Sequence, residues 1–192
     1  TGTKANPYEL IEGKTADLDF KYSTTNWTNG SVTVTATTTN SAYTIQTSKD
    51  GGITWSNSAS QTLTANGYVY ARLLDGTKEI NFASAQVTKI DKTAPKIASI
   101  STSGNSITFR GTDEDSGISG YYYKTNSSTP TSFYGCTNTD IYDKTITGLS
   151  YGSTYYVWVK DAAGNPVYNG TVTTQNGNKI TLKTSSFFGY DN

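Results

Sequence analysis

The feature that most constrains the fold is a series of short runs in which β-branched or aromatic residues alternate with polar ones. In Ser31–Thr39, valine and alanine side chains alternate with threonines, which is the period of a strand buried on one face. Further runs are Tyr43–Thr47, Ile53–Trp55, Gln61–Thr64, Tyr68–Leu73, Ile80–Lys89, Ser106–Arg110, Gly120–Lys124 and Lys144–Thr147. No window shows a 3.6-residue apolar period, so the sequence predicts an all-β fold without helices.

Turn residues separate these runs. Asn66-Gly67 and Asp75-Gly76 are dipeptides that supply the positive φ angles of tight hairpins, and Lys49–Gly52 is a further turn segment. Strands at this spacing, divided by such turns, are typical of antiparallel β-sandwiches.

The order of runs and turns returns after Pro95, which indicates an internal repeat of about ninety residues. The segment around Pro95 therefore reads as a short linker, stiffer than a Gly/Ser tether because proline fixes its own φ. We expect one domain over residues 8–92 and a second over 96–175. Residues 176–192 form a C-terminal extension that adds a strand or opens a further repeat.

Several segments resemble the immunoglobulin-like repeats of bacterial, especially Gram-positive, surface proteins. They are Trp27–Val34, Asp50–Trp55, Asn66–Arg72, Ile90–Pro95, Asp115–Ile118 and Lys160–Asn165. Gly148–Tyr155 also resembles a fibronectin type III signature, with Tyr151 where proline is usual. The resemblance implies two tandem immunoglobulin-like or fibronectin III-like antiparallel β-sandwiches, and it implies little about a ligand.

Strand periodicity assigns side chains to the two faces of the predicted strands. The residues expected to point into the cores are Val69, Ala71, Leu73, Tyr155, Val157 and Val159. The residues expected to point outward are Tyr68, Tyr70, Arg72, Tyr156, Trp158 and Lys160. Tyr155 is also the candidate for a tyrosine corner, in which its hydroxyl bonds the backbone upstream.

Composition excludes several classes of function. The chain has 192 residues, zero formal net charge and no Lys/Arg cluster, which argues against nucleic-acid and anionic-membrane partners. No apolar run is long enough to span a membrane. The chain has no His and one Cys, so histidine-dependent catalysis, Cys/His zinc sites and an intrachain disulfide are excluded, and we expect no enzyme activity.

A calcium site is the main candidate for bound chemistry. Asp113 and Asp115 lie in an acidic loop between two predicted strands, Asp161 lies in a later loop, and Asp91 lies in the linker. In an immunoglobulin-type sandwich these loops share one end, and hard cations take several charged oxygens. We expect either an interdomain Ca²⁺ site at these four residues or a solvated acidic loop that caps its own turn; no other cofactor is indicated.

Aromatic residues are the other hint of binding. Tyr121, Tyr122 and Tyr123 are consecutive, so at least one faces solvent in a strand, and Trp158 is expected on an outer face. Exposed rings stack on sugars or fill protein pockets, but cross-strand aromatic pairs also stabilise sheets without a ligand.

The sequence thus predicts a non-catalytic, extracellular stalk module that projects a distal domain, secreted or attached to a cell wall. Its partners are neighbouring domains of the same polypeptide, with a host glycan or protein as a further ligand. A start at Thr1 suggests an excised fragment whose anchor lies elsewhere. The alternatives are an adhesin or carbohydrate-binding module, an accessory domain of a secreted polysaccharide-degrading enzyme, or a pilus-type filament subunit.

Overall fold

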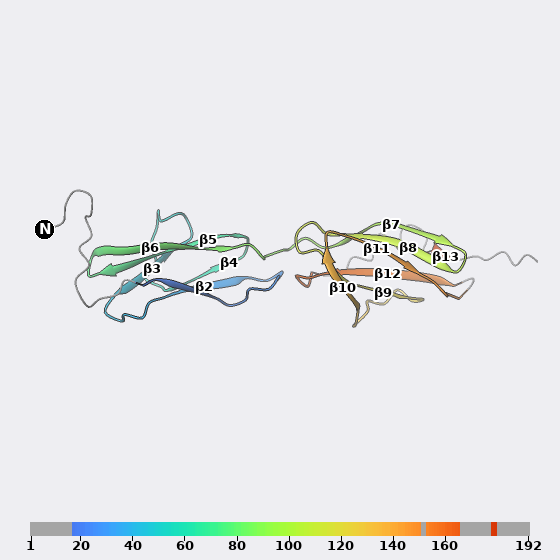
Figure 1. Ribbon diagram of the computed structural model, residues 1–192, viewed down its shortest axis with the longest axis horizontal. Helices are drawn as coiled ribbons and strands as arrows, with labels where there is room; N and C mark the ends of the chain where they lie inside the picture. The colour runs from blue at the N-terminus through green and yellow to red at the C-terminus, as the bar shows by residue number, and fades with distance from the viewer. Residues whose placement is uncertain (1–16, 151–152, 166–177, 180–192) are drawn as a thin grey trace, which may run out of the picture. The chain divides into compact units, whose positions relative to one another are not determined.

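The computed structural model describes residues 17–150, 153–165 and 178–179 and contains no helix among them (Figure 1). The chain divides into two compact units, with the division between Ile90 and Asp91. The parts of the predicted domains at 8–16 and 166–175, and most of the predicted extension, lie outside the described residues.

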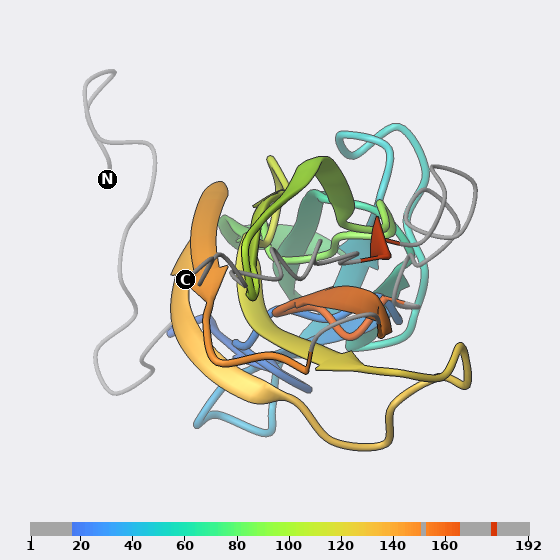
Figure 2. The same cartoon turned by 90° about the vertical axis from the view of Figure 1, so that its right-hand side faces the viewer.

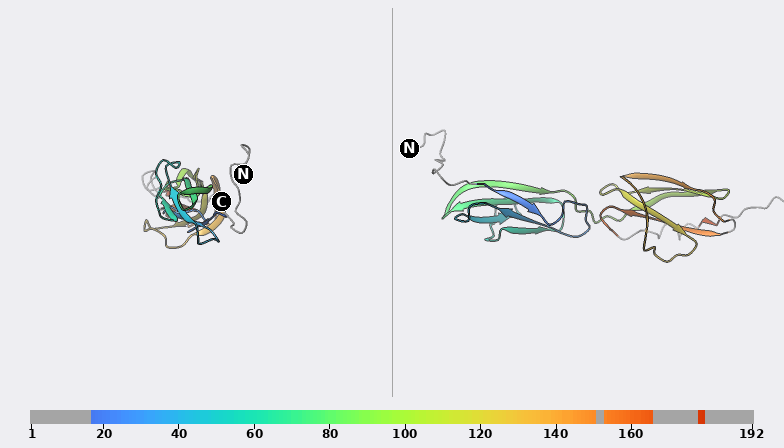
Figure 3. Two further views of the ribbon diagram at one scale, coloured as in Figure 1. Left: turned by 90° about the vertical axis from the view of Figure 1, so that its left-hand side faces the viewer. Right: turned by 60° about the horizontal axis from the view of Figure 1, so that its bottom comes forward.

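The first unit is a sandwich of two three-stranded antiparallel sheets. Its strands are β1 (Asp19–Tyr22), β2 (Val32–Thr37), β3 (Thr44–Ser48), β4 (Ser60–Leu63), β5 (Gly67–Asp75) and β6 (Lys78–Val87). One sheet has the order β1-β2-β4 and the other β3-β5-β6, so the unit reproduces the A-B-E and C-F-G sheets of an immunoglobulin-like domain (Figures 1 and 3).

The second unit repeats this arrangement with one additional strand, so that seven strands are described. These are β7 (Lys96–Ser103), β8 (Ser106–Thr112), β9 (Ile118–Lys124), β10 (Tyr134–Thr139), β11 (Ile141–Ile146), β12 (Thr154–Asp161) and β13 (Asn178–Lys179). The sheet β11-β8-β7 faces the sheet β10-β9-β12-β13. In Figure 2 the light-green strands β7 and β8, which belong to one of these two sheets, lie apart from the orange strand β12, which belongs to the other. The prediction of immunoglobulin-like β-sandwiches is therefore confirmed.

Alternating burial builds each core. In β2, valine and alanine side chains are buried while the threonines between them are only partly covered. Val69, Ala71 and Leu73 of β5 are fully buried, as the strand period predicted. In the second unit Tyr155, Val157 and Val159 of β12 pack in one core cluster with Phe109 and Ile118.

The tyrosine corner is present. The backbone N–H of Ser150 donates to the hydroxyl oxygen of Tyr155 at 3.0 Å, and the ring of Tyr155 is buried. The bond ties the loop before β12 to the core, which is the role such corners have in sandwiches of this type.

Two local predictions were wrong. Ile53–Trp55 is a loop rather than a strand, because both carboxylate oxygens of Asp50 accept from the N–H of Thr54 and fold the chain back. Gly67 does not have the positive φ expected of a tight turn: it begins β5, and the Asn66 side chain bonds the N–H and carbonyl of Ile90. Asp75-Gly76 does form the predicted turn, with Gly76 at φ 62°.

Three strands carried too little alternation to be predicted. They are β1, β7 and β10, which are largely exposed. The predicted extension contributes the two-residue strand β13, which pairs antiparallel with Thr154 and Tyr155 of β12.

Candidate functional site

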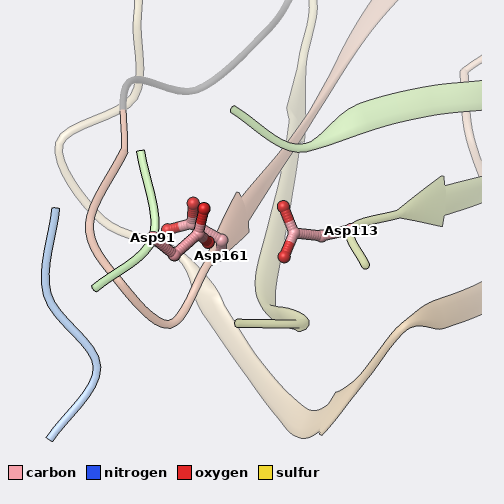
Figure 4. Close-up of side chains that lie close together, drawn as sticks. All are labelled: Asp91, Asp113 and Asp161. Atoms are coloured by element: carbon pink, nitrogen blue, oxygen red, sulfur yellow. The ribbon is translucent and has the colours of Figure 1, made fainter. Parts of the chain in front are cut away.

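Three buried aspartates meet at one end of the second unit. Asp91 lies before β7, Asp113 directly follows β8, and Asp161 is the last residue of β12. Their exposed fractions are 2%, 4% and 2%. One carboxylate oxygen from each lies within 4.8 Å of the others, and Figure 4 shows Asp113 extending from its loop toward Asp91 and Asp161.

Two of these aspartates are placed by the same local device. An Asp113 oxygen accepts from the backbone N–H groups of Ser116 (3.0 Å) and Gly117 (2.7 Å), three and four residues ahead. An Asp161 oxygen accepts from Gly164 (2.7 Å) and Asn165 (3.0 Å) at the same spacing. Short polar side chains favour such backbone bonds, so each loop folds around its own carboxylate.

Glycine completes the first of these loops. Gly117 has φ 77°, and a Cβ there would lie 3.1 Å from the backbone nitrogen of Thr139. Both the left-handed backbone and the close approach require glycine at this position.

Asp91 joins the cluster through bonds to other segments. Its carboxylate accepts from the N–H of Thr93 at 2.8 Å and from the hydroxyl of Ser116 at 2.5 Å. The Asn165 amide donates to the carbonyls of Asp91 (3.1 Å) and Thr93 (3.0 Å) and to the Asp161 carboxylate (2.7 Å). The segment that leads into β7 is thereby fastened to the loops after β8 and β12.

The cluster concentrates negative charge away from water. Two unit charges about 5 Å apart repel by roughly 3 kcal/mol at an effective dielectric constant of about 20. Within the described part of the chain, no Lys or Arg forms an ion pair with Asp91, Asp113 or Asp161. Burial, together with the charges of Asp91 and Asp161, raises the pKa of Asp113.

One atom of the cluster stands apart from the others. The Oδ2 atom of Asp113 is buried and accepts no hydrogen bond from any described residue. Like the other oxygens of the three carboxylates, it is of the type that hard cations take as ligands.

Asp115, the fourth predicted ligand, lies outside this cluster. Its side chain is exposed and accepts a bond from the hydroxyl of Thr93 at 3.1 Å. Asp113 and Asp115 alternate along an irregular loop, and the turn that buries the first directs the second toward solvent.

The predicted aromatic patch does not form an exposed surface. Trp158 lies on the face of β12 opposite the core, as predicted, but its exposed fraction is 0%. Tyr121 and Tyr123 are half-buried and pack against the core cluster. Tyr122 stacks on Tyr134 with ring centroids 5.5 Å apart. Ring contacts of this kind between neighbouring strands contribute to the stability of a sheet.

The first unit instead carries a row of rings on the outer face of its β3-β5-β6 sheet. The centroid distances are 6.1 Å from Tyr68 to Tyr70, 6.1 Å from Tyr70 to Phe82, and 6.2 Å from Phe82 to Trp55. Tyr68 is 45% exposed and Phe82 is 49% exposed. The Arg72 guanidinium lies 4.4 Å from the Trp55 ring centroid. We call Tyr68, Tyr70, Phe82 and Trp55 the aromatic row.

Sequence reasoning assigned Tyr68 and Tyr70 outward but missed the row. Phe82 lies opposite Arg72 on the neighbouring strand, and this register was the signal that could have identified it. Trp55 reaches the row from a loop, which the strand pattern does not show.

No protein-family model and no curated protein sequence matches the chain. Among solved structures, the crystal structure of the chicken interferon gamma receptor alpha chain is similar at 11% sequence identity and a TM-score of 0.34, covering 78% of this chain and 93% of that one. A TM-score this low does not establish a shared arrangement of strands. Among the described residues no helix is long and apolar enough to cross a membrane. The strand order and register described above are what identify both units as immunoglobulin-like β-sandwiches.

Proposed function

We propose that this chain is a non-catalytic structural module of an extracellular protein, which spaces other domains of its polypeptide from a surface. The observation that carries the proposal is the set of hydrogen bonds that hold the segment leading into β7 against two other loops. Asp91 and Thr93 are bonded through side chains to Ser116 and Asn165 on two other loops. A force that pulls on this segment has to break these bonds before β7 can separate from β8.

Other contacts of the second unit support the same role. Strands β7 and β8 pair over nearly their whole length, and the hydroxyl of Tyr155 holds the loop before β12. Buried side-chain bonds between segments distant in sequence raise the free energy of local opening. The acidic groups serve to hold loops, and an exposed reactive group is not needed for this function.

More specifically, we propose that the chain is part of the stalk of a secreted or cell-wall-attached protein of a Gram-positive bacterium. This assignment is supported by the sequence resemblance of segments such as Ile90–Pro95 and Lys160–Asn165. In this proposal the partners are neighbouring domains of the same polypeptide.

Single-molecule pulling on the whole chain, carried out in EDTA, tests the structural role. Two unfolding events are expected, each releasing about 75 residues and thus roughly 25 nm of chain at about 3.4 Å per residue. Asn165→Ala lowers the force of one event and leaves the other unchanged, while Asn126→Ala, an exposed control in the same unit, lowers neither. A second unit that extends without a force peak, or an Asn165→Ala chain that matches its control, contradicts the proposal.

The aromatic row favours a second candidate function, the binding of a neutral glycan. Its four rings follow one another at nearly equal spacing and present apolar area next to amide groups. Gln46 accepts from Arg72 at 2.8 Å and donates to Asn57 at 2.5 Å, so these groups are held beside the rings. Aromatic rings with neighbouring polar groups suit stacking on sugar rings.

Affinity electrophoresis through gels that contain neutral polysaccharides tests this second function. Retarded migration is expected, and Tyr70→Ala with Phe82→Ala is expected to abolish it. Tyr22→Ala, an exposed tyrosine of the other sheet, is the control. Unretarded migration in every gel, or equal retardation of both variants, contradicts glycan binding by this face.

A further inference from the structure

We infer that Asp91, Asp113 and Asp161 bind one hard divalent cation, and that Ca²⁺ is the ion that fits best. The inference deepens the proposed structural function and rests on it, because the ion joins the same three segments that the side-chain bonds fasten. The inference identifies a divalent cation as the group that balances the charge of the three carboxylates.

The arrangement of charge is the first reason. Three carboxylates from segments far apart in the sequence converge with one oxygen each within 4.8 Å, and all three side chains are buried. Buried acidic groups normally pair with a cation or lose their charge, and no described Lys or Arg pairs with these. A proton neutralises one of three charges, whereas a divalent ion neutralises two.

The Oδ2 atom of Asp113 is the second and independent reason. It is buried, accepts no hydrogen bond from the described residues, and belongs to a side chain that points toward Asp91 and Asp161 (Figure 4). Buried polar atoms nearly always have a partner, and one that lacks a partner among protein groups indicates a bound ion or water. A cation between the three carboxylates supplies that partner.

The loops also orient the carboxylates in advance. Backbone N–H groups hold one oxygen of Asp113 and one of Asp161, and such bonds favour the charged form of a carboxylate. The ion therefore meets ligands that are already positioned, and little chain entropy is lost on binding.

The donor set selects the class of ion. The chain has no His, and its one Cys, Cys136, lies on β10 with its thiol directed to the carbonyl of Ile118. All the available donors are oxygens, which favours Ca²⁺ and Mg²⁺ over zinc or copper. Ca²⁺ accepts six to eight oxygens in irregular geometry, whereas Mg²⁺ requires a near-ideal octahedron that loops tied by backbone bonds adapt to poorly.

Calcium titration of the whole chain tests the inference. Isothermal titration with Ca²⁺ alone, and separately with Mg²⁺ alone, gives the stoichiometry. Unfolding of the second unit is followed by the fluorescence of Trp158 in a background of Trp27→Phe and Trp55→Phe, because the chain has three tryptophans. We expect one Ca²⁺ per chain, and a thermal midpoint that rises with Ca²⁺ and returns to its starting value with EDTA.

Two matched variants locate the ion. Asp113→Asn removes the charge but keeps an oxygen that can accept the N–H bonds of Ser116 and Gly117, so it is expected to fold and to bind Ca²⁺ at least about tenfold more weakly. Asp115→Asn removes a carboxylate from the same loop but outside the cluster, and it is expected to bind as the parent does.

Three results overturn the inference. The first is no binding of Ca²⁺ or Mg²⁺ at low millimolar concentration, which leaves a proton to neutralise the cluster. The second is Ca²⁺ binding that Asp113→Asn leaves intact, and the third is binding that Asp115→Asn abolishes. Each of these leaves the structural function untouched, because that function fails only in the pulling experiment, carried out in EDTA.

Discussion

Replacement of Asn165 by alanine tests the fastening of the second unit most directly. The Asn165 amide has two hydrogens and lies within 3.1 Å of three acceptors, namely the carbonyls of Asp91 and Thr93 and the carboxylate of Asp161. Alanine removes both hydrogens and leaves these acceptors without that donor.

The expected loss follows from the number of bonds. A neutral hydrogen bond contributes about 1 kcal/mol to stability and a bond to a charged group about 1.5–3 kcal/mol. The two amide hydrogens of Asn165 make one bond to a charged carboxylate and one to a neutral carbonyl at a time. Losing both bonds lowers the free energy of unfolding of the second unit by roughly 3 kcal/mol. Asn165→Asp is expected to lose more, because it also adds a fourth carboxylate beside Asp161.

Urea unfolding measures this loss when Trp158 is the only tryptophan, since its ring is fully buried in the folded second unit. Asn126→Ala is the control: it removes only solvent-exposed bonds, which the side chain accepts from Ser128 in the same unit, and it is expected to change stability by less than about 0.5 kcal/mol. If Asn165→Ala matched this control, or if Asn165→Asp were more stable than Asn165→Ala in EDTA, the reasoning about the cluster would be refuted.

Three further substitutions have defined expectations. Tyr155→Phe removes the bond from the N–H of Ser150 and is expected to lower the second unit's free energy of unfolding by about 1 kcal/mol in the same urea assay; no change would contradict the corner's role. Phe109→Ala opens a cavity at a side chain that is 1% exposed and is expected to lower the second unit's free energy of unfolding by about 3–5 kcal/mol in the same assay; a loss no larger than that of Tyr155→Phe would contradict its place in the core. Hydrogen bonds to the Asp50 carboxylate, above all from the Ser48 hydroxyl and then from Thr54, hold the pKa of Asp50 well below its ordinary value. Ser48→Ala is therefore expected to raise the pKa of Asp50 in an NMR titration of the carboxyl carbon. Because the folded-state pKa of Asp50 is lowered, the stability from this loop is present above the ordinary Asp range and is lost as pH falls through the folded-state pKa; an unchanged Asp50 titration in the variant would contradict the assignment.

Faces of strands could be predicted because the period of two is a property of the chain itself. Val69 and Leu73 are buried where alternation placed them, and the hydroxyl of Tyr155 bonds the backbone as expected. The edge strands β1 and β7 could not be predicted in this way, since an exposed strand needs no apolar alternation.

The acidic site could be predicted in part. The spacing of Asp113 to Gly117 and of Asp161 to Asn165 is local, and it indicates loops that fold around a carboxylate. Asp115 looked equivalent to Asp113 in the sequence, and only the path of the loop separated the exposed side chain from the buried one.

The sequence by itself determined the main core strands, the Asp75-Gly76 turn and the inward side of those strands, because alternation and turn chemistry act between near neighbours. Tertiary structure alone decided that Asp91, Asp113 and Asp161 meet in one buried cluster and that Trp158 is buried on a face expected to be exposed. Convergence and burial depend on how sheets and loops distant in sequence pack together, and no local pattern encodes that packing.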